Sequence, residues 1–180
     1  MKTSHMLFTS LLFIILTLTL ASMLILSSCS TQQNNSNELV VGTCAGFPPY
    51  EILANNGDII GFDIDVMQKI AEKLNKQLII KDMAFDALLV ALKQNKIDAI
   101  IAGISITQSR LAEISMVHYH GKPIKTLPIL FWKEIPAGVK TIADLATQPN
   151  KTVCAQVGTI QEEILSKYTY LDIKNLENIP

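Results

Sequence analysis

Arg110 is the one arginine in this chain of 180 residues, and every other member of the fifteen Lys and Arg residues is a lysine. It follows the apolar run 97–102 and lies in the first turn of an expected helix. A guanidinium is a flat, permanently charged fork that matches a carboxylate, and the first turn of a helix offers free N–H groups to the same anion. The residue type and its position therefore predict a carboxylate-binding pocket. The alternative is a solvated arginine in a chain that otherwise uses lysine.

Other residues that could bind a metal or act as acids or bases give weaker evidence of a site. The cluster His118, Tyr119 and His120 has no partner ligand nearby, so we expect a surface segment rather than a metal site, and no cofactor. We expect Asp63 and Asp65 to cap and solvate the start of a helix.

The cysteines have separate expected roles. Cys44 and Cys154 lack the spacing of metal ligands. They would be able to pair in an oxidising compartment, but we expect both to be free and half-buried.

The first 28 residues have the pattern of an export signal. Lys2 precedes an apolar run over 6–26 that contains no acidic residue, and Leu-Ser-Ser-Cys ends at Cys29. This ending resembles a bacterial lipobox, which implies lipid attachment to Cys29 and cleavage before it. The alternative is an uncleaved membrane helix. The polar segment 29–37 is expected to be a flexible tether.

Composition narrows the class of the remainder. A net charge of −1 gives no electrostatic argument for nucleic acid. The mean hydropathy of +0.31 is raised by the leader. About 150 residues remain, enough for one domain or two small lobes.

Hydrophobic periodicity alternates between strand and helix from Glu38 onward. Strands are expected at 38–43, 77–83 and 97–102, helices at 63–74 and 85–94, and a hairpin at 50–61 around Asn55-Asn56-Gly57. The helix at 63–74 has an apolar stripe formed by Ile64, Met67, Ile70, Ala71 and Leu74, and the next helix turns Leu88, Leu89 and Leu92 inward. This order predicts a layered α/β body with parallel strands. Ligands bind at the carboxyl ends of such strands, so the segments 43–47 and 103–110 should converge.

A second junction lies further along the chain. The segment 126–133 is expected to be extended, 151–157 to be a strand, and Gly158-Thr159 to open a helix that runs to about residue 168. Two strand-to-helix junctions could hold a small ligand from opposite sides. The alternative is one continuous domain with two unrelated turns.

Seven short motifs carry a family resemblance from about Leu39 to Gln161. They are Val41-Gly-Thr43, Phe47-Pro-Pro-Tyr-Glu51, Gly61-Phe-Asp-Ile-Asp65, Phe85-Asp-Ala-Leu-Leu89, Lys96-Ile-Asp-Ala99, Ile104-Ser-Ile-Thr-Gln-Ser-Arg110 and Gln156-Val-Gly-Thr159. In order and spacing they resemble the polar amino-acid-binding proteins of bacterial ABC importers, extracellular solute-binding protein family 3. The resemblance implies an α/β, periplasmic-binding-protein-like (type II) fold of two lobes around a ligand cleft. It implies a signal peptide over 1–28, a tether over 29–37, lobe 1 over 38–122, and the crossover with a partial lobe 2 over 123–180.

The same resemblance implies roles for individual residues. Arg110 is expected to bind the ligand α-carboxylate, together with N–H groups near Gly103 and Ser105 and the Ser105 hydroxyl. Phe47 and Phe85 are expected to sandwich the ligand side chain, which favours a cation such as arginine, lysine or ornithine. Gln156 and Thr159 are expected to contact the ligand from the second lobe. The alternative is that both phenylalanines belong to the core. Thr159 would also be able to cap a helix, which is compatible with the ligand contact.

Departures from the family pattern limit these expectations. Cys44 stands at a ligand-site position where members favouring basic side chains often have an acidic residue, and Ile160 stands where a second threonine is common. The chain ends at Pro180, before the second crossover and the region of the acidic partner for the ligand ammonium. The resemblance therefore implies an incomplete second lobe, and we expect this polypeptide alone to bind weakly or not at all.

Three function classes are compatible with these residues and motifs. The first is a lipid-anchored receptor on the periplasmic or cell-surface side of a bacterial membrane, which delivers an amino acid to an ABC permease and has no enzymatic activity. The second is a cyclohexadienyl or arogenate dehydratase-like enzyme, for which Glu51 and the histidines are the candidate acids and bases. We expect Glu51, however, to be a strand-edge residue bonded to a neighbouring loop. The third is a truncated receptor remnant with little function.

Overall fold

The computed structural model describes residues 37–119, 121, 126–131 and 133–177. These residues belong to one compact unit, Asn37–Pro180. The expected signal peptide, Cys29 and nearly all of the tether lie outside the described residues, as does His120. No helix of the described part is long and apolar enough to cross a membrane.

A parallel sheet is built around β1 (Glu38–Thr43), with β4 (Gln77–Asp82) on one side and β5 (Ala99–Ile100) on the other. The register pairs Glu38 with Gln77 and Thr43 with Asp82, while Val41 pairs with Ala99. The predicted parallel direction of the strands is confirmed, although only two residues of the apolar run 97–102 pair in the sheet.

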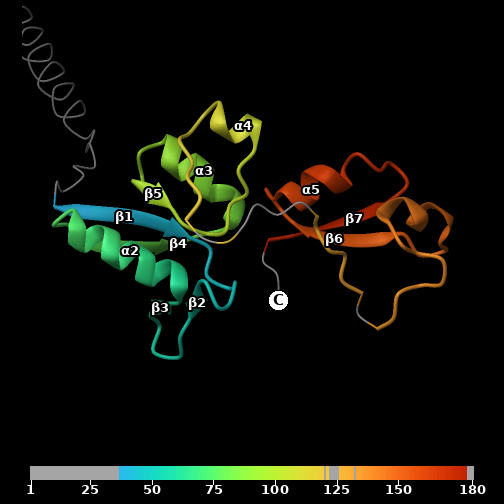
Figure 1. Cartoon of the computed structure of the whole chain (residues 1–180), viewed down its shortest axis with the longest axis horizontal. Coiled ribbons are helices and arrows are strands. Elements are labelled where there is room, and N and C mark those ends of the chain that lie inside the picture. Colours follow the sequence, from blue (N-terminus) through green and yellow to red (C-terminus); the bar gives the residue numbers. More distant parts are fainter. Residues whose placement is uncertain (1–36, 120, 122–125, 132, 178–180) are drawn as a thin grey trace, which may run out of the picture. The chain divides into compact units, whose positions relative to one another are not determined.

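Helices α2 (Phe62–Lys73) and α3 (Phe85–Lys93) cover opposite faces of this sheet (Figure 1). Alternate residues of β1 point to the two sides, as the strand period requires. One core cluster consists of Leu39, Val41, Met67, Ala71 and Ile101, and the other consists of Val40, Ala91 and Ile97. Leu88 is also fully buried, as predicted. The result is the layered α/β body that the sequence predicts.

The start of α2 differs from the prediction. The N-cap residue is Gly61, with φ 136°, and Asp63 lies inside the first turn with its side chain buried. A Cβ at Gly61 would collide with the main-chain oxygen of Tyr50, so the chain enters the helix by a route that only glycine permits. Asp63 therefore neither caps nor solvates the helix, whereas Asp65 is exposed.

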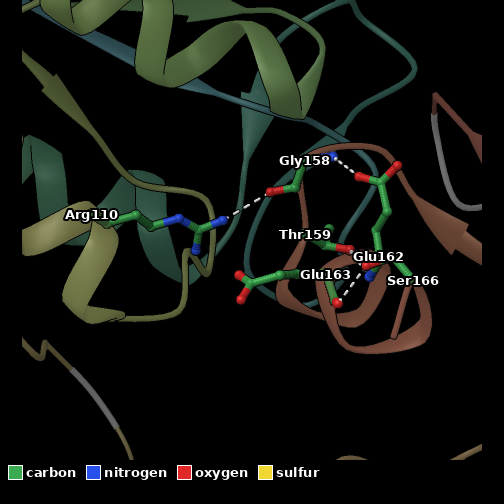
Figure 2. A pocket seen from close by; sticks show the side chains of 6 residues that line it. All are labelled: Arg110, Gly158, Thr159, Glu162, Glu163 and Ser166. Atoms are coloured by element: carbon green, nitrogen blue, oxygen red, sulfur yellow. Dashed lines mark hydrogen bonds between the residues drawn. The ribbon is translucent and has the colours of Figure 1, made fainter. Parts of the chain in front are cut away.

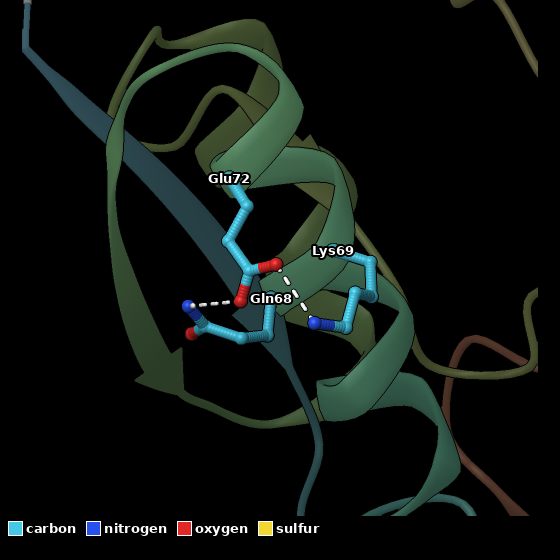
Figure 3. A network of polar contacts seen from close by, with 3 residues as sticks. All are labelled: Gln68, Lys69 and Glu72. Atoms are coloured by element: carbon cyan, nitrogen blue, oxygen red, sulfur yellow. Dashed lines mark hydrogen bonds and ion pairs between the residues drawn. The ribbon is translucent and has the colours of Figure 1, made fainter.

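The apolar stripe of α2 is buried only in part. Met67 and Ala71 are buried, but Ile70 and Leu74 are exposed. The solvent-facing side of the helix carries a small polar network, in which Glu72 accepts from Lys69 at 2.8 Å and from Gln68 at 3.4 Å (Figure 3). Such exposed pairs add little stability.

The expected hairpin is present as β2 (Ile52–Leu53) and β3 (Ile59–Ile60), which pair antiparallel. Gly57 has φ 89°, as a tight turn requires.

A second, smaller sheet follows later in the chain. Here β6 (Thr152–Gln156) pairs in parallel with β7 (Asp172–Leu176), and α5 (Ile160–Leu165) connects them. The predicted strand and helix are confirmed, but α5 ends before residue 168. A 3-10 helix, η2 (Ile142–Thr147), begins with a capping box between Thr141 and Asp144. The described residues of 126–133 form no strand.

Candidate functional site

The loops that follow β1 and β5 meet at Phe47 and Gly103. Both strands run parallel, so their carboxyl ends share one edge of the sheet. Gly103 has φ 59°, and a Cβ added to it would lie 3.5 Å from Cε1 of the Phe47 ring. The ring therefore rests on a residue without a side chain. This confirms the expected convergence of the two segments.

Arg110 lies in α4 (Gln108–Leu111), a single turn whose N-cap Thr107 accepts from the Arg110 N–H at 3.2 Å. Its guanidinium donates from Nη1 to the Ser105 carbonyl at 2.7 Å and from Nη2 to the Gly158 carbonyl at 2.8 Å. Figure 2 shows the side chain extending from α4 toward the turn before α5. Two segments 48 residues apart are thus joined through one side chain.

The guanidinium is half-buried. Burial lowers the pKa of Arg110, and the negative charge of Glu163 opposes this effect. The group nevertheless stays charged, because an arginine starts so far above neutrality. A charged, partly desolvated fork is suited to an anion with two oxygens.

The N–H of Gly103 has a partner within the protein. It donates to the hydroxyl of Tyr119, which in turn donates to Oδ2 of Asp63 at 2.8 Å. The contact of this N–H with a ligand stays a prediction. Ser105, by contrast, is positioned beside Arg110 through its carbonyl.

Cys44, Phe85 and Gln156 come together at the end of β1. Gln156 places Nε2 3.7 Å from Sγ of Cys44, and the main-chain N–H of Phe85 also donates to this sulfur. Burial raises the pKa of the Cys44 thiol, so the group is neutral near pH 7. Cys44 is free and half-buried, as expected, whereas Cys154 is free but exposed.

The two phenylalanines have different surroundings. Phe47 is 50% exposed and stacks on Tyr50 with ring centroids 5.3 Å apart. Phe85 is half-buried at the start of α3. The exposed face of Phe47 excludes a purely core role for that ring.

Thr159 acts as a helix cap. Its hydroxyl accepts from the N–H of Glu162 at 3.3 Å and donates to the Gln156 carbonyl at 2.7 Å. The N–H of Gly158 is bound by the Glu162 carboxylate at 2.7 Å. The helix cap is therefore present in the structure, and the ligand contact of Thr159, which is compatible with it, stays a prediction.

A cavity of about 340 Å³ lies beside Arg110. Its lining, drawn in Figure 2, consists of Arg110, Gly158, Thr159, Glu162, Glu163 and Ser166. The two glutamates were not among the predicted site residues. The sequence did contain a signal for them, because both lie in the first turn of the helix that follows Gly158-Thr159. Residues of that turn lie at the same end of the helix as the predicted ligand contact.

The structure places Glu51 beside the loop that carries Phe47. Glu51 is bonded to a neighbouring loop, as expected, because it forms an isolated bridge with Phe47 directly before β2, but its side chain is 1% exposed and lies against Asp63. A residue so buried does not reach a substrate, which removes the named carboxylate of the enzyme alternative. The described residues contain no cluster of three metal-ligating side chains.

Comparison with known proteins gives one consistent family. Residues 39–127 match the model of the bacterial extracellular solute-binding proteins, family 3. The chain is 39% identical over 145 residues to the probable ABC transporter arginine-binding protein ArtJ of Chlamydia trachomatis, covering 81% of this chain and 54% of ArtJ. It is 31% identical over 140 residues to the arginine-binding extracellular protein ArtP of Bacillus subtilis, covering 76% and 51%. The chain thus spans about half the length of these relatives.

Solved structures agree. Holo ArgBP from T. maritima superposes with a TM-score of 0.65 at 34% identity, covering 79% of this chain and 61% of that one. An ancestral arginine-binding protein bound to arginine gives 0.62 at 29% identity, covering 79% and 62%. These similarities support the type II periplasmic-binding-protein fold. The matched proteins are described as binding proteins of transporters, not as enzymes.

Proposed function

Because the chain belongs to the bacterial extracellular solute-binding proteins of family 3, we propose that it binds an amino acid, with arginine as the first candidate. The observation that carries this proposal is the Arg110 guanidinium, half-buried between the Ser105 and Gly158 carbonyls. A ligand carboxylate exchanges these neutral acceptors for charged ones, and charge-assisted hydrogen bonds are the stronger kind.

The proposed ligand side chain is cationic. The exposed face of Phe47 offers cation–π attraction, which contributes about 0.5–2 kcal/mol according to desolvation. Glu163 adds negative charge to the cavity beside Arg110. Cys44 contributes no charge, because its thiol is neutral. The names of relatives in three bacteria also refer to arginine, which supports this choice.

The remaining parts of the proposal concern location and partners. We place the domain on the outer side of a bacterial membrane, anchored by lipid on Cys29 and serving the permease of an ABC transporter. The lipobox-like sequence ending at Cys29 supports the anchor. Metabolic labelling with an alkynyl fatty acid should mark the wild-type chain and leave Cys29→Ala unmarked, and an unmarked wild-type chain would refute the anchor.

The binding proposal is tested by an NMR titration of the full chain in mild detergent, which measures weak and strong binding alike. Arginine should bind, while agmatine, which has the same guanidinium but no carboxylate, should bind at least tenfold more weakly. Arg110→Ala should remove this preference, because a ligand carboxylate would then be buried without a partner. Arg110→Lys keeps the charge but loses the fork, so it should bind arginine with intermediate affinity.

A matched control is Lys93→Ala, which removes an exposed cation paired with Glu113 at 2.9 Å. It should leave the preference for arginine unchanged. Equal affinities of arginine and agmatine for the wild-type chain would refute the carboxylate role of Arg110.

A further inference from the structure

A buried pair of acidic residues lies beside the loop 47–51, which we call the aromatic loop because it contains Phe47 and Tyr50. The ligand contacts proposed above do not involve this pair. Glu51 and Asp63 are 1% and 0% exposed, and the Tyr119 hydroxyl donates to Oδ2 of Asp63 at 2.8 Å. No ion pair among the described residues includes either carboxyl. Two neighbouring carboxylates that are buried without a counter-ion are strongly disfavoured as a doubly charged pair.

The unused oxygens indicate how the cluster avoids this cost. Oε2 of Glu51 and Oδ1 of Asp63 are buried and have no hydrogen-bond partner. A single proton held between the two carboxyls gives one of them a donor and removes one negative charge. Burial and the adjacent Asp63 raise the pKa of the Glu51 carboxyl to about 8, in agreement with this arrangement.

The cluster is connected to both loops of the candidate site. Phe47 and Glu51 exchange main-chain hydrogen bonds of 2.8 and 3.1 Å, so Glu51 closes the loop that carries the Phe47 ring. Tyr119 accepts from the Gly103 N–H, and the Phe47 ring rests on Gly103. A change at the carboxyl pair therefore reaches Phe47 and Gly103 through few intervening bonds.

We propose that Glu51 and Asp63 share one proton and, through Tyr119, act as positioning residues that hold the Phe47 loop and Gly103 in the arrangement that binds the ligand. This inference rests on the proposed binding function. Loss of the shared proton leaves two negative charges side by side, and their repulsion separates the α2 start from the aromatic loop. Ligand affinity then falls as the pH rises.

The ionisable groups around the pair come from each neighbouring segment. Asp63 faces Glu51 from α2, Tyr119 faces Asp63 from the segment after α4, and Cys44 lies near Glu51 in the loop after β1. Burial, with the charges of Asp82 and Glu51, raises the pKa of the Cys44 thiol above its ordinary value. Burial and Asp63 also raise the pKa of the Tyr119 hydroxyl. Both therefore stay mainly protonated while the carboxyl pair titrates.

The shared proton is tested without a ligand. NMR titration of the full chain in mild detergent, with the glutamate side-chain carboxyls labelled with ¹³C, gives one curve per glutamate, and Glu51→Gln identifies the curve of Glu51. This carboxyl should titrate far above the exposed glutamates, and Asp63→Asn should return it toward the ordinary range. A Glu51 curve that coincides with those of the exposed glutamates would overturn the shared proton.

The positioning role is tested by arginine affinity at about pH 6 and about pH 9. If the binding arrangement needs the proton, the wild-type chain should bind about tenfold more weakly at the higher pH, because each pH unit above the pKa costs a factor of ten. Glu51→Gln has an amide in place of the protonated acid. Its affinity should fall between the two pH values only as far as the loss of the α-ammonium proton of arginine requires. Tyr119→Phe should bind about fivefold more weakly at both pH values, because it loses the link between Asp63 and Gly103.

The matched control is Asp65→Asn, which removes an exposed carboxylate from the same helical turn and should follow the wild-type profile. Arginine loses its own α-ammonium proton in this range equally for every variant, so the comparison with Glu51→Gln isolates the pair. Equal pH dependence of the wild-type chain and Glu51→Gln would overturn the positioning role. If arginine bound no variant, the binding function would fail and the positioning role with it, while the carboxyl titration would still decide the shared proton.

Discussion

The β4-β1-β5 sheet and the β6–β7 pair differ in how much core supports them. The first is covered by α2 and α3 and buries apolar side chains on both faces, including Val41, Ala71 and Leu88 at 0% exposure. Among the described residues from 126 to 177, the buried hydrophobic residues are Val139, Leu145 and Ala155, and α5 buries none of its side chains.

Because of this difference, we expect the two regions to contribute differently to ligand binding at the proposed site. The well-packed sheet carries the loops with Phe47 and Gly103, and Arg110 follows them in α4, although its guanidinium also bonds to Gly158. Gly158 and Thr159 lie in the turn between β6 and α5, in a region with little core, where local opening costs less free energy. We therefore expect binding of the ligand carboxylate to depend mainly on the β4-β1-β5 sheet and the segments that follow its strands.

The largest expected effect concerns the entrance to α2. Gly61→Ala places a Cβ against the main-chain oxygen of Tyr50, so the backbone has to move, and we expect a loss of about 4 kcal/mol in unfolding free energy. Gly57→Ala is the matched control, because Gly57 also has positive φ but has open space around it. It should lose about 1 kcal/mol. Urea denaturation measures the unfolding free energy of both variants. Equal losses would show that the positive φ alone, and not the collision with Tyr50, destabilises Gly61→Ala.

The second prediction compares the cores directly. Leu88→Ala empties a fully buried position of the first region and should cost about 3 kcal/mol. Leu165→Ala, at a half-buried position of α5, should cost about 1 kcal/mol because less apolar area is lost. If Leu165→Ala proved as destabilising as Leu88→Ala in urea denaturation, the β6–β7 region would have a stronger core than its burial indicates.

The smallest effect separates the two roles considered for Thr159. Thr159→Ala removes the cap of α5 and should lower unfolding free energy by about 1 kcal/mol, whereas Thr159→Ser keeps the hydroxyl and should lose less. Hydrogen exchange at the amides of α5 follows the change locally. Unchanged exchange in Thr159→Ala, together with weaker arginine binding, would instead favour a ligand contact over a cap.

Periodicity and turn chemistry were enough to predict β1, β4, β6, α3 and the hairpin. Local patterns failed where long-range contacts decide. Asp63 was expected to cap a helix because acidic residues usually do so, but its partner Tyr119 is 56 residues away, and no local signal connects them. Ile70 and Leu74 continue the apolar period of α2, yet they are 40% and 54% exposed.

For the candidate site too, the sequence predicted local features but not contacts between distant segments. Arg110 was found from composition, and its contact with Ser105 lies within one short segment. Its contact with Gly158 depends on how distant segments pack. The resemblance assigned the Gly103 N–H to the ligand, and nothing in the local sequence indicated its hydrogen bond to the Tyr119 hydroxyl.

The most direct test of the carboxylate role uses the fact that Arg110 is the one arginine of the chain. A full chain labelled with ¹⁵N-arginine should give a single set of guanidinium signals, all from Arg110. Unlabelled arginine should shift these signals until they saturate, and agmatine at the same concentration should not, because it has no carboxylate to accept from Nη1 and Nη2. Guanidinium signals that stay unchanged while main-chain signals of the first region report arginine binding would contradict the account.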